Sequence, residues 1–302
     1  MNKITFIFIS CFFLLLALYS GVTELNGPEQ VIPAVAFIAL LGIPHGAIDH
    51  ILFLEKSKWS PLAFYAFYLG MVGIYVVAWL YFPALSMLLF LLLSAYHFGQ
   101  SQLVDIDFSG KWRRMLIYFS WGASILSALI VYNQVEIVNL SKGYEEMQLL
   151  LPVMSETPNL IVLIACTALV VILLAEALVR KRISGDRFAM ELFLLFVIHF
   201  SFLALPILTA FSLYFVILHS LKVLSDEYKF LSRSRKRLWV KKFIHLLWPY
   251  TLLSLIGTAI ILGLSYAEWI EVSQLFLVFI LISVLTLPHS IVMEKFYQTQ
   301  KS

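Results

Sequence analysis

Long apolar runs alternate with short polar segments along the whole chain. A helix rises about 1.5 Å per residue and a bilayer core is about 30 Å thick, so a membrane span needs roughly 20 mostly apolar residues. By this measure the pattern predicts ten spans, at about 4–23, 31–54, 61–82, 84–104, 114–134, 158–179, 188–205, 207–224, 243–265 and 271–293. Pro83 and Pro206 separate neighbouring spans, because proline interrupts a helix. We therefore expect an all-α polytopic bundle of membrane helices, forming a single domain over residues 1–302.

The basic residues test this reading independently. All but one of the 21 lysines and arginines lie in alternate loops or at the termini, and Lys142 is the exception. Because basic residues concentrate in cytoplasmic loops, the pattern predicts that both termini are cytoplasmic. We expect a multi-pass protein of the cell membrane, the bacterial inner membrane. The first segment is interpreted as a span, since it is long for a signal peptide and lacks a clear cleavage site.

Composition narrows the classes further. Hydrophobic residues make up 61% of the chain and charged residues 13%, which excludes a soluble domain. The two cysteines lie inside apolar runs, so neither a disulfide framework nor a Cys/His zinc site is indicated. The chain has no glycine-rich nucleotide motif. The basic run 229–242 is typical of a loop facing anionic lipid headgroups, and we expect no nucleic-acid partner.

Four histidines occupy similar depths in four different predicted spans. They are His45, His97, His219 and His289. Ionisable groups inside a membrane are costly and usually face a bundle interior, a cavity or a partner. A single such histidine could equally form an interhelical hydrogen bond, but four neutral imidazoles can surround iron, zinc, copper or nickel. Of the remaining histidines, we expect His199 to be a packing or hydrogen-bonding group and His245 an interfacial residue.

Two residues near His45 are candidates for supporting such a site. Asp49 follows His45 by four residues and shares its helix face, so its carboxylate could orient His45 or a histidine on a neighbouring helix. His50 lies about 140° around the helix from His45, which places it in a supporting role rather than beside His45. Gly46 and Ser290 are small enough to allow close helix approach next to two of the imidazoles.

The segments PHGAIDH at 44–50, YHFGQ at 96–100, YFVILHS at 214–220 and PHSIVME at 288–294 resemble the Brp/Blh family of β-carotene 15,15′-dioxygenases. The motifs span nearly the whole chain in the family's order. The resemblance implies a membrane enzyme that uses Fe(II) and O₂ to cleave the central double bond of β-carotene into two retinal molecules. The implied partners are a carotenoid dissolved in the lipid bilayer, O₂, and a rhodopsin that could receive the retinal.

The sequence departs from the family pattern at one metal ligand. Carried over by position, the family's iron histidines fall on His45, His97 and His219, and a further histidine is expected where this chain has Val223. His289 is the preferred replacement because of its matching depth, followed by His50. A missing ligand could also mean an altered substrate or lost activity.

Other functions remain open at this point. One is an oxygenase acting on another carotenoid or lipid. A second is a transporter that uses the histidines as proton or metal relays, which proton-coupled flux would reveal. A third is a relative that binds pigment without cleaving it, which retention of intact pigment would reveal. A di-iron desaturase is disfavoured because seven histidines are too few and only His45 and His50 are closely spaced.

Overall fold

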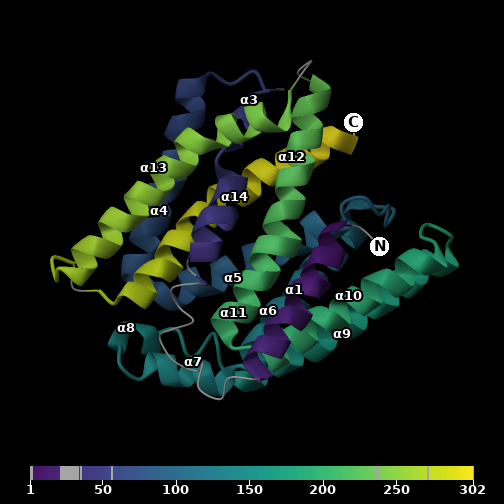
Figure 1. The fold of residues 1–302 in the computed structure, drawn as a ribbon, viewed down its shortest axis with the longest axis horizontal. Helices are drawn as coiled ribbons and strands as arrows, with labels where there is room; N and C mark the ends of the chain where they lie inside the picture. Colours follow the sequence, from purple (N-terminus) through teal and green to yellow (C-terminus); the bar gives the residue numbers. More distant parts are fainter. Residues whose placement is uncertain are drawn as a thin grey trace. The chain divides into compact units, whose positions relative to one another are not determined.

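The computed structural model describes residues 3–20, 34, 36–55, 57–234, 238–270 and 272–301, and every regular element within these ranges is helical (Figure 1). The elements are α1 (Lys3–Ser20), η2 (Ile38–Gly42), η3 (Ile43–Gly46), α3 (Asp49–Leu54), α4 (Pro61–Tyr81), α5 (Pro83–Leu103), α6 (Lys111–Tyr132), α7 (Gln134–Ser141), α8 (Glu145–Gln148), α9 (Glu156–Val179), α10 (Gly185–Ala204), α11 (Ile207–Leu213), η4 (Tyr214–Ser220), α12 (Leu221–Ser234), α13 (Val240–Tyr266) and α14 (Gln274–Lys301). The all-α prediction is confirmed.

Eight helical stretches in the described part of the chain are long and apolar enough to cross a membrane. They match eight of the ten predicted spans. The first two predicted spans correspond to shorter apolar helices, Lys3–Tyr19 and Ile38–Leu54. The start of the second span at 31–33, the basic residue Lys56 and the basic positions 235–237 lie outside the described residues. The cytoplasmic placement of the termini stays a prediction.

Two predicted spans differ from the helices observed. The eighth continues beyond 224 and runs without a break as Ile207–Ser234, because the polar second half keeps its apolar side chains on one face and so remains helical. The second span is not one regular helix. It passes through the π-helix η2 and the 3₁₀-helix η3 before α3 begins, and Pro44 lies where a regular helix would need a backbone N–H.

The described chain groups into two compact units, each built from three separate segments. Unit 1 contains residues 1–42, 95–140 and 154–222, and unit 2 contains residues 43–94, 141–153 and 223–302. Helices α5 and α12 both pass from one unit into the other. The single-domain interpretation stays a prediction, and each unit is described by itself below.

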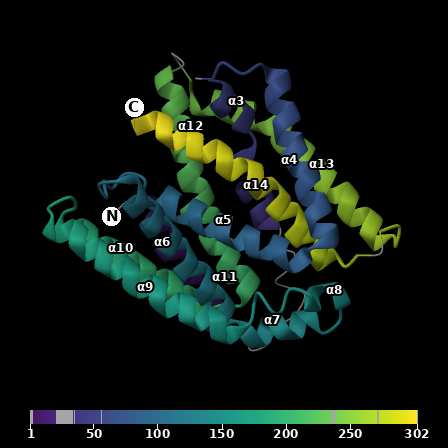
Figure 2. The same cartoon turned by 180° about the vertical axis from the view of Figure 1, so that it is seen from behind.

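In unit 1, α6 packs along α9 and α10 (Figure 2). Helix α1 packs against α10, α11 and η4. Two glycines let the C-terminal half of α5 approach α6 backbone to backbone. A Cβ on Gly99 would lie 1.8 Å from the Tyr118 carbonyl oxygen, and a Cβ on Gly122 would lie 1.9 Å from the Ala95 carbonyl oxygen. No side chain fits at either position. This contact fixes the part of α5 that carries His97.

In unit 2, α14 packs against α3, α4 and α13, and both views show α14 beside α4 (Figures 1 and 2). Trp79 of α4 meets Phe276 of α14 edge to face, with ring centroids 5.5 Å apart. The Tyr75 hydroxyl donates to the Ser86 carbonyl oxygen at 2.7 Å. The first contact joins α4 to α14, the helix that carries His289, and the second joins α4 to the start of α5.

Candidate metal centre

His97 and His219 form a pair inside unit 1. His97 lies on α5 and His219 on the π-helix η4, and the two rings meet edge to face with centroids 4.8 Å apart. Both side chains are buried, with exposed fractions of 1% and 2%. Short π-helical stretches inside longer helices occur frequently at functional sites, so the backbone around His219 fits such a role. The structure therefore brings together two of the four predicted ligands.

Ser101 fixes the orientation of the His219 ring. Its hydroxyl donates to the Phe98 carbonyl oxygen at 2.9 Å, and its oxygen lies 3.1 Å from His219 Nδ1. Since the hydroxyl hydrogen is directed to Phe98, the Ser101 oxygen acts as the acceptor and His219 Nδ1 carries the proton. The lone pair of the ring is then on Nε2, the nitrogen able to bind a metal.

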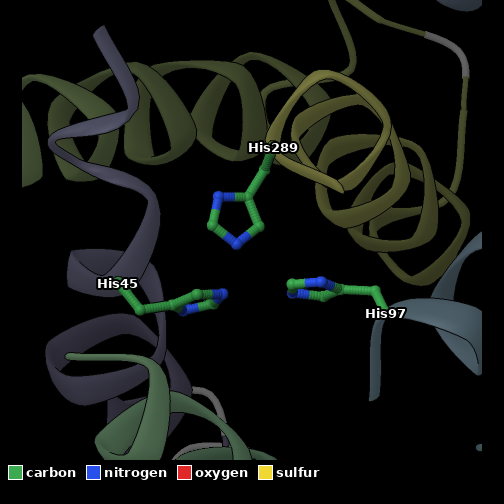
Figure 3. A group of neighbouring side chains, drawn as sticks. All are labelled: His45, His97 and His289. Atoms are coloured by element: carbon green, nitrogen blue, oxygen red, sulfur yellow. The ribbon is translucent and has the colours of Figure 1, made fainter. Parts of the chain in front are cut away.

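His45 and His289 form the corresponding pair in unit 2. Their rings also meet edge to face, with centroids 4.7 Å apart, and both side chains are buried. Figure 3 shows these two side chains, drawn with His97 of unit 1. His45 lies in the 3₁₀ turn after Pro44, and His289 follows Pro288 within α14. A Cβ on Gly46 would lie 3.5 Å from His289 Nδ1, in ordinary contact, so the small residue at this position lies directly against the imidazole as expected.

Asp49 connects this pair to helix α4. Its two carboxylate oxygens accept separate hydrogen bonds, one from His289 Nδ1 at 2.8 Å and one from the Tyr68 hydroxyl at 3.1 Å. Of the two roles considered for Asp49, the contact with a histidine on another helix is therefore the one observed. Because a carboxylate only accepts, His289 Nδ1 carries the proton and Nε2 has the lone pair. His219 likewise carries its proton on Nδ1 and its lone pair on Nε2.

We expect Asp49→Asn to weaken metal binding about 10- to 100-fold, the usual cost of losing a residue that orients a ligating histidine. Asparagine keeps the size of the side chain, but it has one acceptor oxygen in place of two and no negative charge, so it cannot accept from both His289 Nδ1 and the Tyr68 hydroxyl. Tyr68→Phe removes only one partner of Asp49, so its effect should be several times smaller. Titration with Fe(II) measures the affinities of the unaltered protein and the two purified variants. Equal affinity of Asp49→Asn and the unaltered protein would contradict it.

A second buried acid lies in unit 2. Glu227 on α12 is fully buried, and neither carboxylate oxygen has a hydrogen-bond partner among the described residues. Its electrostatic interaction with Asp49 places the two carboxyl groups in the same part of unit 2. A buried polar group without a partner costs stability, so Glu227 is not explained by packing. Sequence reasoning missed Glu227, Tyr68 and Ser101, because nothing in their spacing distinguishes them.

The other histidines lie apart from these pairs. The His50 ring contacts Tyr65 and Tyr250, with centroid distances of 6.0 and 4.4 Å. His199 Nε2 lies 3.1 Å from the Ser124 hydroxyl, which confirms its expected hydrogen-bonding role. His245 is exposed on α13. Val223, where the resemblance to the family predicts a further ligand, is fully buried.

The buried histidines fit a metal ion as its ligands. His45, His97 and His289 could each provide one ring nitrogen. For His219 and His289, neighbouring groups already hold Nδ1 and leave Nε2 as the donor. Neutral imidazole is a good ligand for iron, zinc and copper.

The chain is similar to known proteins over most of its length. The family model for β-carotene 15,15′-dioxygenase matches residues 36–297. The chain belongs to this family. A β-carotene 15,15′-dioxygenase from uncultured marine bacterium 66A03 is 26% identical over 281 residues, covering 89% of this chain and 94% of the relative. No solved structure matches the chain.

Membership in the β-carotene 15,15′-dioxygenase family confirms the resemblance read from the motifs. The matched region contains both histidine pairs together with Asp49, Tyr68 and Glu227. It favours an enzyme that acts on a carotenoid over a transporter. The eight apolar helices agree with a multi-pass membrane protein.

Proposed function

We propose that this protein cleaves the central 15,15′ double bond of β-carotene with O₂ and releases two retinal molecules. In this proposal His45, His97, His219 and His289 are the ligands of one Fe(II) ion. Asp49 supports the site by orienting His289. The family supports the reaction, and the buried histidine pairs support the metal.

The observation that carries the proposal is the tautomer shared by His219 and His289. In each ring a hydrogen bond holds Nδ1, to Ser101 in one case and to Asp49 in the other. A histidine that only forms an interhelical hydrogen bond does not need a second residue to fix its tautomer. A histidine that binds a metal usually has such a residue. The same hydrogen-bonded Nδ1 in both rings supports a role as metal ligands for His219 and His289.

Iron bound by these residues would supply the reactivity toward O₂ that a carbon–carbon double bond lacks. In the overall reaction the double bond breaks and each carbon receives one oxygen atom, so neither a proton nor an external reductant is consumed. The chain therefore needs no proton relay and no nucleotide site. Its residues orient the imidazoles and exclude water, and Phe98 contributes to this by lying 4.6 Å from the His219 ring.

The proposed reaction takes place within the membrane. β-Carotene dissolves in the bilayer, so a site among membrane helices can receive it laterally. The retinal produced could supply a rhodopsin in the same membrane. We place the protein in the bacterial inner membrane with both termini in the cytoplasm, in accordance with its basic residues.

Expression in bacteria that accumulate β-carotene tests the reaction. We expect the orange colour to fade and retinal to appear in extracted pigments, and His45→Ala and His219→Ala to abolish both changes. His245→Ala is the matched control, because this histidine is exposed and should leave activity unchanged. Unchanged β-carotene beside well-expressed protein would refute the reaction. Intact pigment that remains bound would indicate a carotenoid-binding relative.

A further inference from the structure

Three aromatic rings stack along the helix that ends in the His97–His219 pair. The rings of Phe211 and Phe215 have centroids 5.4 Å apart and planes within 16° of parallel. The rings of Phe215 and His219 have centroids 5.5 Å apart and planes within 24°. Phe211, Phe215 and His219 thus form a continuous row, which we call the ring ladder.

The two phenylalanines of the ring ladder keep part of their surface open. Among residues 210–220 every side chain is buried except those of Phe211 and Phe215. The two partly accessible side chains therefore lie in the same row as the buried His219, at intervals of four residues. Large apolar side chains that remain partly accessible beside a buried polar group are typical of small-molecule sites.

Gly42 provides the space that the middle ring occupies. A Cβ at this position would lie 2.8 Å from Phe215 Cε1, closer than real Cβ atoms come, and 3.3 Å from Phe215 Cδ1, which is a tight contact. Glycine at the end of η2 therefore allows Phe215 to lie parallel to its neighbours. The alignment of the ladder depends on a residue outside its own helix, within the same unit.

Stacking of phenylalanines alone does not indicate a site. Phe196 and Phe200 on α10 are also stacked, with centroids 6.1 Å apart and planes within 7° of parallel, and both are exposed. That pair does not continue to any of the four candidate ligands. The ring ladder differs because its row ends at a candidate metal ligand.

We propose that the ring ladder binds one conjugated arm of the carotenoid and thereby selects the double bond held beside His219. This inference rests on the proposed function. A polyene is straight and flat, so a molecule lying along the helix meets near-parallel rings in the same relative orientation at each step. Aromatic contacts of this kind favour a conjugated π surface over a saturated lipid chain. The distance along the ladder then sets which bond reaches the metal.

Binding can be measured separately from cleavage. The purified full-length protein is titrated with β-carotene before iron is added, and the absorbance change of the bound polyene is followed. We expect Phe211→Leu and Phe215→Leu each to weaken binding about ten-fold, equivalent to about 1.4 kcal/mol. Phe200→Leu is the matched control, since it removes a stacked ring from the same unit and should bind like the unaltered protein. Leucine keeps each position apolar, which preserves the fold.

Cleavage products provide the second measurement. With iron added, Phe215→Leu and Gly42→Ala should release aldehydes of unequal length in addition to retinal, while their iron content stays unchanged. If the unaltered protein binds β-carotene but cleaves nothing, the proposed function fails, and weaker binding by the ladder variants still supports the ladder. Equal binding by all variants, or no binding by the unaltered protein, would overturn it.

Discussion

Alanine in place of Gly122 is expected to prevent stable folding. The added Cβ would lie 1.9 Å from the Ala95 carbonyl oxygen and 2.6 Å from the Ala95 Cα. These are backbone atoms of α5, so no side-chain rotation can relieve the collision, and the two helices must separate. Overpacking of a core commonly costs about 1–3 kcal/mol, and a collision with backbone lies at or beyond the upper end of this range.

The same argument applies to Gly99→Ala, whose Cβ would lie 1.8 Å from the Tyr118 carbonyl oxygen. Gly257→Ala is the matched control. Gly257 also lies within a helix, but a Cβ there would meet nothing within 4 Å. Because alanine favours a helix by up to about 1 kcal/mol over glycine, this variant should be as stable as the unaltered protein or more so. Thermal unfolding in detergent separates the three variants, and a Gly122→Ala midpoint within one degree of the unaltered protein would show that the contact is absent.

We also expect the α5–α6 contact to affect metal affinity. The α5–α6 contact holds the segment that carries His97, so any Gly99→Ala protein that still folds should have lost metal affinity. We therefore expect folding and metal binding to be coupled through Gly99 and Gly122, neither of which has a side chain that could bind a metal.

Hydropathy and charge placed most of the helices correctly, because a membrane span is defined by the length of an apolar run. The same reasoning ended the eighth span too early, since a helix can continue beyond the apolar run when its polar half keeps an apolar face. The irregular backbone of η2 and η3 was also missed. Pro44 signals a break, but which helical form replaces the α-helix depends on packing against η4 and α13.

The candidate histidines could be selected from their depth, because a polar group in an apolar run is visible in one dimension. Of their partners, Asp49 could be selected because it follows His45 by four residues, but Tyr68 and Ser101 could not. Tyr68 belongs to none of the sequence motifs, and it contacts Asp49 only because α3 packs on α4. Ser101 reaches His219 across 118 positions of sequence. Such contacts depend on how helices rotate against one another, and a single sequence carries little information about this rotation.

Replacing His289 by alanine is expected to remove bound iron and retinal production together. The change deletes a proposed ligand, so its cost should exceed the about 10- to 100-fold loss expected when only an orienting residue is removed. It also leaves Asp49 without the ring it holds at 2.8 Å. The iron content of protein loaded without oxygen measures the first effect, and pigment chromatography measures the second. His199→Ala is the control, because this partly buried histidine bonds to Ser124 and lies outside both pairs.

Substitutions at Val223 test whether His289 is a metal ligand. It lies four residues after His219 and so shares its helix face, at the position where the family pattern has a histidine. If His289 replaces that ligand, His289→Ala combined with Val223→His should regain iron that His289→Ala alone has lost. Val223→His by itself should bind iron normally and cost about 1–3 kcal/mol of stability, since it enlarges a fully buried side chain. Retention of iron by His289→Ala would instead show that three histidines suffice, and the family position would then have been lost without replacement.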